Sequence, residues 1–516
     1  MSDMMEVQRG LATCAILAAA LTAALTAPIS SPSSALALDC GWQDSHPAVP
    51  ANPNPNSLSS VAVAGPGDAW AAGSMEFGGV ILEHFYANAW HVTTGVDPAG
   101  SDGAQFTGIS ASGPRDAWAV GSYRAASHAW ESLVEHWDGS RWSLISTPAG
   151  FDQAELGAVA ARNGSDAYAV GQIRHPTNQN SGIPHGVALH WDGRSWQPLG
   201  DPGEGSLQSM TVISDDDIWA VGSTVDFTGS IKTYPVAKHW DGMTWSDRTP
   251  PGLGEGTLGS VSGVAGDVWT VGYASSGTAI SREWSGGSWH DRGSPAGNGH
   301  VSLGGVAYLS ASQVIAVGFV SPSNSLTDAT PLESRWNGSA WETETGTPNG
   351  GYLQAVTVRN SAEAWAVGSE LGGTQGRSIA RRVACGAPPE VVIPTSQQPP
   401  FGYTPQPPSP TAGPSPTGGM GGAPSNSLPV VAAPVVSAPT TSPAAAPSTA
   451  PTAVASVDPT PLRAGVKGVT ARPATVTAGG LAARTAGPWG VAGLLVGLAT
   501  LSLLRWRRRS GRRLPG

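Results

Sequence analysis

Asp116-Ala117-Trp118-Ala119-Val120-Gly121, followed at a short distance by His136-Trp137-Asp138-Gly139-Ser140-Arg141-Trp142, is the stretch that decides the fold of this chain. The first motif shows no helical periodicity and is assigned to strand two. The second holds an Asp-Gly dipeptide between apolar residues, which is the strongest short signal for a β-hairpin. Together they predict strands two, three and four of a small antiparallel sheet, with strand one in the apolar run that precedes them.

The first motif recurs seven times, and its period identifies the architecture. The central positions are 70, 118, 168, 219, 269, 315 and 365. Their spacing runs from 46 residues (Trp269 to Ile315) to 51 residues (Tyr168 to Trp219). This period is typical of a four-stranded propeller blade and is too long for leucine-rich, ankyrin or tetratricopeptide repeats. We therefore predict an all-β fold, a seven-bladed β-propeller.

The seventh repeat is incomplete, and the start of the mature chain supplies what it lacks. The repeat stops at Cys385-Gly386 without a strand-four tryptophan, whereas Asp39-Cys40-Gly41-Trp42 has no earlier strands of its own. With this segment the strand-four tryptophan occurs seven times, at Trp42, Trp90, Trp142, Trp196, Trp245, Trp289 and Trp341. Because a closed ring leaves no open sheet edge, we predict that an N-terminal strand closes the last blade.

Cys40 and Cys385 should face each other across the broken hairpin of that blade. They are the only cysteines in the predicted mature chain, and export permits oxidation. We predict a disulfide between them. In the chain-entropy model, closing so long a loop stabilises the fold by about 4–5 kcal/mol.

Histidines and aspartates recur at fixed places in the repeats. The histidines of strand three are His84, His136, His190 and His239. The aspartates before strand two are Asp68, Asp116, Asp166, Asp217 and Asp267. Since the ligands of one metal must converge and these histidines lie in different blades, we interpret them as structural, with a His–Asp hydrogen bond in each blade. The aspartates suit turns, where such side chains cap the backbone.

The repeats resemble those of secreted β-propeller proteins of actinobacteria, which are loosely kelch-like in their Gly and Trp pattern. The resemblance covers about residues 40–386 and concerns architecture. The chain departs from kelch repeats because a single glycine mostly follows strand two. It departs from the sialidase Asp-box because Asp138 and Gly139 are adjacent. Neither family's function carries over.

Both ends of the chain carry targeting signals. Residues 1–37 resemble a secretory signal peptide, and we assign 38–386 to the propeller. Residues 387–487 are rich in Pro, Ala, Ser and Thr, which predicts a disordered stalk. Residues 488–504 hold no charge and 505–516 hold six arginines, so we predict a transmembrane helix and a basic cytoplasmic tail. Leu481-Ala482-Ala483-Arg484-Thr485-Ala486-Gly487 resembles a sortase signal, which leaves covalent cell-wall attachment as the alternative.

Charge and motif content narrow the function. The net charge is −10 although the C-terminal tail is basic, so the ectodomain is too acidic for nucleic acid. No nucleophile elbow, zinc-protease motif or phosphate-binding loop occurs, so we expect no catalytic residue, no cofactor and no metal ion. We expect a monomer.

The loops between strands two and three form the predicted binding face, since loops on a rigid scaffold usually carry function. The candidate ligand-binding residues are Tyr123, Arg124, His128 and Trp130, then Arg174, His175, Asn178, Gln179, Asn180 and His185, then Asp226, Phe227, Lys232 and Tyr234. The leading hypothesis is a cell-surface recognition or scaffold module that binds an extracellular protein or glycan. The alternative is an extracellular carbohydrate-active hydrolase or lyase on the same scaffold.

Overall fold

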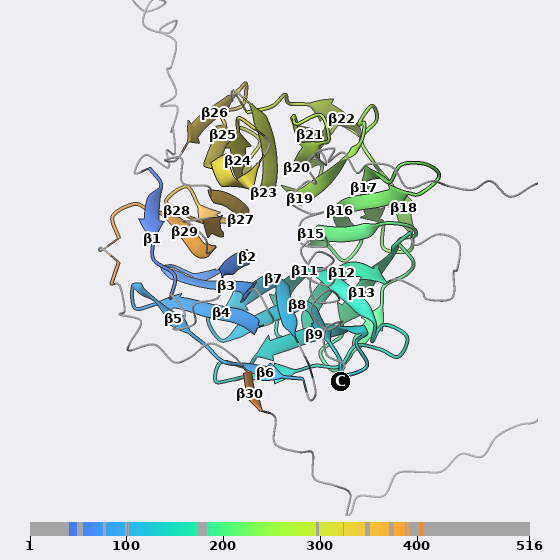
Figure 1. Cartoon of the computed structure of the whole chain (residues 1–516), viewed down its shortest axis with the longest axis vertical. Coiled ribbons are helices and arrows are strands. Elements are labelled where there is room, and N and C mark those ends of the chain that lie inside the picture. The colour runs from blue at the N-terminus through green and yellow to red at the C-terminus, as the bar shows by residue number, and fades with distance from the viewer. Residues whose placement is uncertain are drawn as a thin grey trace, which may run out of the picture. The chain divides into compact units, whose positions relative to one another are not determined.

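In the computed structural model, seven antiparallel sheets of four strands each are arranged in a ring, and the residues that the structure describes hold almost no helix (Figure 1). The structure describes residues 41–48, 55–75, 79–98, 101, 103–173, 183–295, 299–323, 325–345, 351–370, 376–387, 390–391 and 403–405. The prediction of an all-β, seven-bladed propeller is confirmed.

Each blade comes from one sequence repeat, except the last. Blade 1 comprises β2 (Asn56–Gly65), β3 (Asp68–Met75), β4 (Gly79–Tyr86) and β5 (Ala89–Val92). Blade 2 comprises β7 (Ala104–Gly113), β8 (Asp116–Arg124), β9 (Trp130–Trp137) and β10 (Trp142–Leu144). Blade 3 comprises β11 (Ala154–Asn163), β12 (Asp166–Ile173), β13 (His185–Trp191) and β14 (Trp196–Pro198). Blade 4 comprises β15 (Ser206–Ser214), β16 (Asp217–Asp226), β17 (Lys232–Trp240) and β18 (Trp245–Asp247).

The second half of the ring continues the pattern. Blade 5 comprises β19 (Gly256–Val264), β20 (Asp267–Ala274), β21 (Ala279–Ser285) and β22 (Ser288–Asp291). Blade 6 comprises β23 (His300–Ser310), β24 (Gln313–Ser321), the 3-10 helix η1 (Leu326–Asp328), β25 (Thr330–Trp336) and β26 (Trp341–Thr345). Blade 7 comprises β27 (Gly351–Asn360), β28 (Glu363–Glu370), β29 (Arg377–Ala384) and β1 (Gln43–Ser45).

Strand β1 closes the ring. It pairs antiparallel with β29, with Gln43 opposite Arg382 and Ser45 opposite Ala380. Trp42 precedes this strand and packs on the cluster formed by blades 6 and 7. The main-chain oxygen of Trp42 accepts a hydrogen bond from the Arg381 side chain at 3.4 Å. The N-terminal segment thus supplies the fourth strand of the last blade.

The glycine that ends each strand-two motif lies where strand two approaches strand one most closely. A Cβ atom there would lie 1.8–2.3 Å from a strand-one carbonyl oxygen in every blade. The seven glycines are Gly73, Gly121, Gly171, Gly222, Gly272, Gly318 and Gly368. Strand one shifts register at this level in each blade, for example between Leu156 and Ala158. The motif therefore ends in glycine because only a residue without a side chain fits opposite the bulge.

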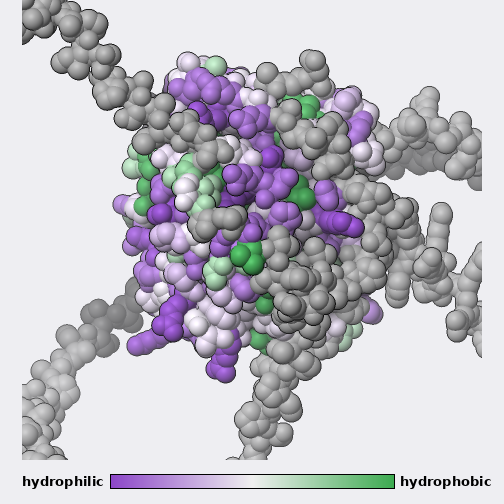
Figure 2. Space-filling model, turned by 90° about the vertical axis from the view of Figure 1, so that its left-hand side faces the viewer, coloured by the Kyte–Doolittle hydropathy of each residue, from purple (hydrophilic) through white to green (hydrophobic). Residues whose placement is uncertain are grey.

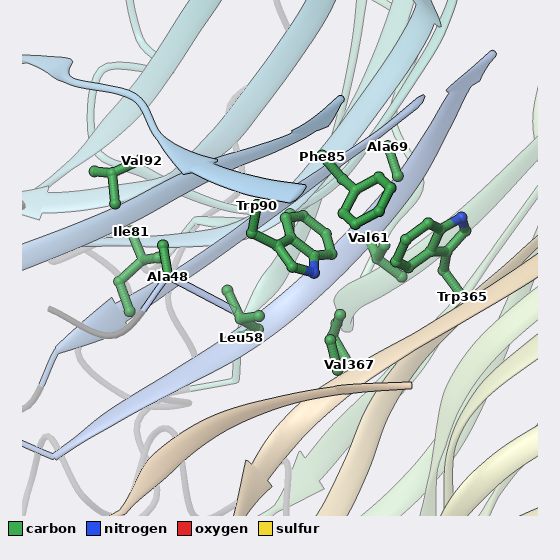
Figure 3. Packing of buried hydrophobic residues seen from close by; sticks show 12 residues of the cluster. Ala48, Leu58, Val61, Ala69, Ile81, Phe85, Trp90, Val92, Trp365 and Val367 are labelled. Atoms are coloured by element: carbon green, nitrogen blue, oxygen red, sulfur yellow. The ribbon is translucent and has the colours of Figure 1, made fainter. Parts of the chain in front are cut away.

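Aromatic rings join most of the blades to the next one. The strand-two ring packs edge-on against the strand-four tryptophan of the following blade, with centroids 5.3 Å apart for Trp70 and Trp142 and 5.2 Å apart for Trp118 and Trp196. Edge-to-face contacts of this kind stabilise a core beyond the area that they bury. The same contact seals the ring between blades 7 and 1, where Trp365 meets Trp90 at 5.4 Å (Figure 3).

Hydrogen bonds between neighbouring first strands hold the inner side of the ring. The hydroxyl groups of Ser60, Ser110 and Ser209 accept hydrogen bonds from main-chain N–H groups of the next blade at 3.0–3.1 Å. Ser260 and Ser262 do the same for blade 6. Small serine side chains allow the first strands to approach closely around the axis.

The described contacts of the chain continue past residue 386. The Glu390 carboxylate accepts hydrogen bonds from the Ser45 hydroxyl at 2.5 Å and from the His46 main chain at 2.8 Å. The main-chain N–H of Val391 donates to Asn88 at 2.7 Å. Further on, β30 (Tyr403–Pro405) pairs in parallel with β6 (Gly95–Asp97). The first residues assigned to the stalk are thus attached to the propeller.

The other predicted segments lie outside the described residues: the signal peptide, the rest of the stalk, the membrane helix at 488–504, the basic tail and the sortase-like run. Within the part of the chain that the structure describes, no helix has the length and apolar character needed to cross a membrane.

On the side shown in Figure 2, hydrophobic residues are scattered among hydrophilic ones.

Candidate ligand-binding face

Strand-two–three loops and the links between blades emerge on one face of the ring, here called the loop face. The turns between strands one and two, and between strands three and four, form the opposite turn face. The described polar side chains of the two faces differ in how many hydrogen bonds and ion pairs they form within the protein. Side chains with fewer such partners are better placed to contact a ligand.

On the turn face, each repeated histidine is paired with the aspartate of its own blade. The Nε2–Oδ1 distances are 2.8 Å for His84 and Asp68 and 2.6 Å for His136 and Asp116. They are 2.9 Å for His190 with Asp166 and 3.0 Å for His239 with Asp217. Each histidine ring also lies against the strand-two aromatic ring of its blade, as in the stacked pair of Trp70 and His84 with centroids 3.8 Å apart. These side chains are held within the blades.

The repeated aspartates receive their hydrogen bonds from side chains rather than from the backbone expected of turn caps. Besides its histidine, Asp217 accepts from the Trp219 indole at 2.9 Å, and Asp267 accepts from the Trp269 indole at 3.1 Å. Hydrogen bonds from His136 and Ser112 hold the pKa of Asp116 below its ordinary value, although burial opposes this effect. Among the described residues, His, Cys, Asp and Glu nowhere gather in a group of three that could hold a metal ion.

Two buried glutamates of strand three bind the links between blades. Glu83 accepts a hydrogen bond from the main chain of Ala48 at 2.9 Å, and Glu135 accepts one from Val96 at 3.1 Å. The other oxygen of each carboxyl group is buried without a partner in the described structure. Burial raises the pKa of both groups to about 8, because an apolar environment disfavours the charged form. Both side chains are therefore neutral at pH 7 and serve the fold.

The loop face of blade 2 presents four of the predicted binding residues on one hairpin. Tyr123 lies opposite Glu131, and Arg124 lies opposite Trp130. The Tyr123 hydroxyl donates a hydrogen bond to the Glu131 carboxylate, and burial together with this bond raises its pKa to about 12. His128 is exposed at the tip, in the left-handed backbone region with φ 64°. Tyr123 and Trp130 are both half-buried, and because successive ladder positions point to opposite faces, they lie on opposite sides of the hairpin.

Blades 3 and 4 contribute further candidates to the same face. His185 pairs with Asp201 at 2.7 Å. In blade 4, β16 and β17 extend as one hairpin whose tip carries Phe227 and Ile231 with exposed fractions of 44% and 56%. Tyr234 is half-buried below them. Lys232 forms an ion pair with Glu255 at 3.0 Å, and Asp226 accepts a hydrogen bond from the main chain of Thr228 at 2.7 Å. Arg174, His175, Asn178, Gln179 and Asn180 lie outside the described residues.

Near the central axis, the loop face has a narrow pocket that the sequence analysis did not identify. Its volume is about 20 Å³, and blades 4 to 7 all contribute to it. Its aromatic lining consists of Tyr273, Phe319 and Tyr352, and its amide lining consists of Gln208 and Gln354. Burial raises the pKa of Tyr352 to about 12, so its hydroxyl stays protonated. No carboxylate is among the residues that line this pocket.

Comparisons with known proteins identify no family. No protein-family model matches the sequence, and no curated protein matches it. Similar solved structures include YCF48 bound to a D1 peptide, with 16% identity, a TM-score of 0.45 and coverage of 66% of this chain and 96% of that one. YCF48 from Cyanidioschyzon merolae has 13% identity, a TM-score of 0.43 and coverage of 66% and 98%. The GH74 xyloglucanase from Xanthomonas campestris has 13% identity, a TM-score of 0.42 and coverage of 64% and 53%.

Proposed function

We propose that this protein is a cell-surface recognition or scaffold module whose loop face binds an extracellular protein or glycan. The observation that carries the proposal is the exposed apolar pair Phe227 and Ile231 on the projecting hairpin of blade 4. Large apolar side chains that stay exposed on a rigid hairpin gain free energy when a partner covers them. The turn face, by contrast, has its repeated histidines and aspartates already paired within the blades.

The placement at the surface rests on the sequence. A secretory signal, a Pro-rich stalk and a C-terminal membrane helix would together present the propeller outside the cell, anchored by its C-terminal end. The sortase-like run keeps wall attachment as the other form of the same proposal.

A carbohydrate-active hydrolase or lyase would need two acidic groups that converge on one substrate. The axial pocket on the loop face has an aromatic and amide lining, and the buried carboxyl groups of Glu83 and Glu135 bind the main chain. At the axial pocket of the loop face, these observations favour binding over catalysis.

The test replaces Phe227 and Ile231 together by serine in the full chain. Met243 on the turn face is the matched control, since its exposed fraction is 84%. We expect the double variant to lose at least about tenfold in affinity for its ligand, found on glycan arrays or in cell-envelope pull-downs, because burying two such side chains is worth about 1.5–3 kcal/mol each. Met243→Ser should bind as the wild type does. Equal binding by the double variant and the wild type would contradict the proposed face.

A further inference from the structure

A second cavity lies on the turn face, between blades 4 and 5. Its volume is about 410 Å³, which lies in the range of small-molecule sites. The residues that line it are Ser214, Asp216, Asp217, Trp219, His239, Arg248, Gly266, Val268 and Trp284. We call it the turn-face cleft. It is separate from the loop face and plays no part in the function proposed above.

The cleft exists because the turn between strands one and two is shortened in blade 5. In the other six blades this strand pair shifts register twice, and the second shift adds a residue just before the turn. Blade 5 has only the first shift, between Leu258 and Ser260. Gly263, opposite Val268, stands where blade 6 has Tyr308, opposite Val314. A shorter turn and a missing side chain leave space against blade 4.

At three other interfaces the corresponding turn contacts the neighbouring blade. At the interface of blades 5 and 6, the Tyr308 hydroxyl donates to Asp267 at 2.8 Å. Between blades 3 and 4, the Tyr168 hydroxyl donates to Asp215 at 3.3 Å. Between blades 7 and 1, the main chain of Gly67 donates to Glu363 at 2.9 Å. In blade 5, a Cβ atom added to Gly266 would meet no atom within 4 Å.

Arg248 in the cleft lacks the partner that its counterpart has one blade further on. The guanidinium groups of Arg248 and Arg292 each lie 5.8 Å from a tryptophan ring centroid of the following blade. Arg292 forms an ion pair with Glu283. Blade 4 has His239 at the position of Glu283, and His239 is bound to Asp217. Among the described residues, Arg248 therefore has no ion-pair partner, and its donors are available to a ligand.

The cleft lining combines hydrogen-bond acceptors, donors and an aromatic surface. Asp216 provides carboxylate oxygens, Arg248 provides N–H donors, and Trp284 provides an indole ring. Asp217 adds a negative charge, although its Oδ1 is already bound to His239 and Trp219. A ligand with hydroxyl groups satisfies both kinds of partner, because each hydroxyl both donates and accepts. Two carboxylates against one guanidinium disfavour an anion. The apolar C–H face of a sugar ring suits an indole.

We propose that the turn-face cleft binds a neutral pyranose sugar ring. Asp216 and Arg248 hold vicinal hydroxyl groups of the sugar, and Trp284 packs against its C–H face. Because the cleft lies on the opposite face from Phe227 and Ile231, the protein holds two separate binding surfaces. Loss of one leaves the other intact.

Saturation-transfer NMR on the full chain tests this site. The probes are the methyl pyranosides of D-glucose, D-galactose and D-mannose, with L-alanine and acetate as charged comparisons. We expect saturation transfer to at least one of the sugars. We also expect the tryptophan fluorescence of the protein to change when that sugar is added. Transfer to none of the three sugars, or to L-alanine or acetate in place of them, would overturn the assignment.

Variants locate the binding. Asp216→Ala and Arg248→Ala should each weaken sugar affinity at least about tenfold, as expected when one charged hydrogen-bond partner is lost. Arg141→Ala is the matched control, since Arg141 is an exposed arginine in the strand-three–four turn of blade 2, and it should leave affinity unchanged.

A turn graft tests the origin of the cleft. Replacing residues 262–266 by the six-residue segment 307–312 of blade 6 restores the longer turn and should abolish binding. If that graft does not fold, the point variants still decide: unchanged affinity in both overturns the proposal. Phe227→Ser with Ile231→Ser should bind the sugar as the wild type does, which separates this proposal from the loop-face function.

Discussion

Several repeated residues of this propeller make contacts that the neighbouring strand or blade requires. The glycine after strand two leaves room for a strand-one carbonyl, and Glu135 holds the link that joins blades 1 and 2 through the main chain of Val96. Because Glu135 is buried and has no counter-charge, it stays protonated in the folded state at a pH where the unfolded chain would ionise it. Its protonation therefore couples to folding.

This coupling predicts how stability depends on pH. The pKa of Glu135 is about 8 in the folded state, against 4.5 as the ordinary value. Between these two pH values only the folded state holds the proton, so the free energy of unfolding falls as pH rises, by about 1.4 kcal/mol per pH unit for this group. Glu135→Gln keeps an acceptor for Val96 and removes the titration. Denaturant unfolding at pH 5, 6, 7 and 8 should show a smaller loss of stability in the variant.

Glu204→Gln is the matched control for that series, since Glu204 is exposed and its replacement should leave the pH profile of the wild type unchanged. Parallel pH profiles for Glu135→Gln and the wild type would show that Glu135 ionises alike in both states.

At the scale of one element, β1 is the first strand of the chain and completes the blade formed by β27, β28 and β29, the last strands of the ring. Its register with β29 gives each pair of opposite residue numbers the same sum, as with Gln43 and Arg382. Cys385 follows β29 directly, and the start of β1 pairs with the end of that strand. Cys40 lies outside the described residues, so the Cys40–Cys385 disulfide stays a prediction.

Peptide mapping under non-reducing conditions should recover Cys40 and Cys385 in one cross-linked peptide. Because the bond would tie β1 to the ring and restrict the unfolded chain, Cys40→Ser should lower the free energy of unfolding by about 4 kcal/mol under oxidising conditions. The same variant should match the wild type once both are reduced. Free thiols at both positions in the secreted protein would refute this prediction.

At the scale of the whole molecule, the propeller is closed by contacts between neighbouring blades. We expect this closure not to depend on which blade contains the break in the chain. Every interface between blades uses an aromatic or apolar strand-two residue against a strand-four tryptophan, including the interface of blades 6 and 7, where Ile315 and Trp42 share one cluster. The blades are therefore equivalent in how they support each other. We therefore expect the fold to tolerate a break in a blade other than blade 7.

A circular permutant tests this equivalence. Asp-Gly-Ser-Arg, the turn of blade 2, would join Val383 to Trp42, and new ends would open between Gly242 and Met243 in the exposed turn of blade 4. We expect the permutant to fold with the far-ultraviolet spectrum of the original propeller and a melting temperature within about 5 °C of it, a change that 1–2 kcal/mol produces in a large domain. Failure to unfold cooperatively would show that the native break is required.

The strand order, the number of blades and the closing role of the N-terminal segment follow from the sequence alone. Turn signals and strand patterns are local, and seven repeats of one pattern leave few alternatives for their arrangement. Spacing within one repeat also predicts the His–Asp pairs. The sequence places Phe227 and Tyr234 in a loop, whereas Tyr234 belongs to β17, and only the structure gives the exposure of Phe227.

Only the tertiary structure decided which sites the blades form together. Tyr273, Phe319 and Tyr352 belong to three different blades and meet near the axis, so no spacing along the chain predicts their contact. The shortened turn of blade 5 is present in the sequence, but what it opens depends on Asp217, His239 and Arg248 across the interface. Sites between blades depend on distances in space, and a repeat pattern specifies the blades without specifying those distances.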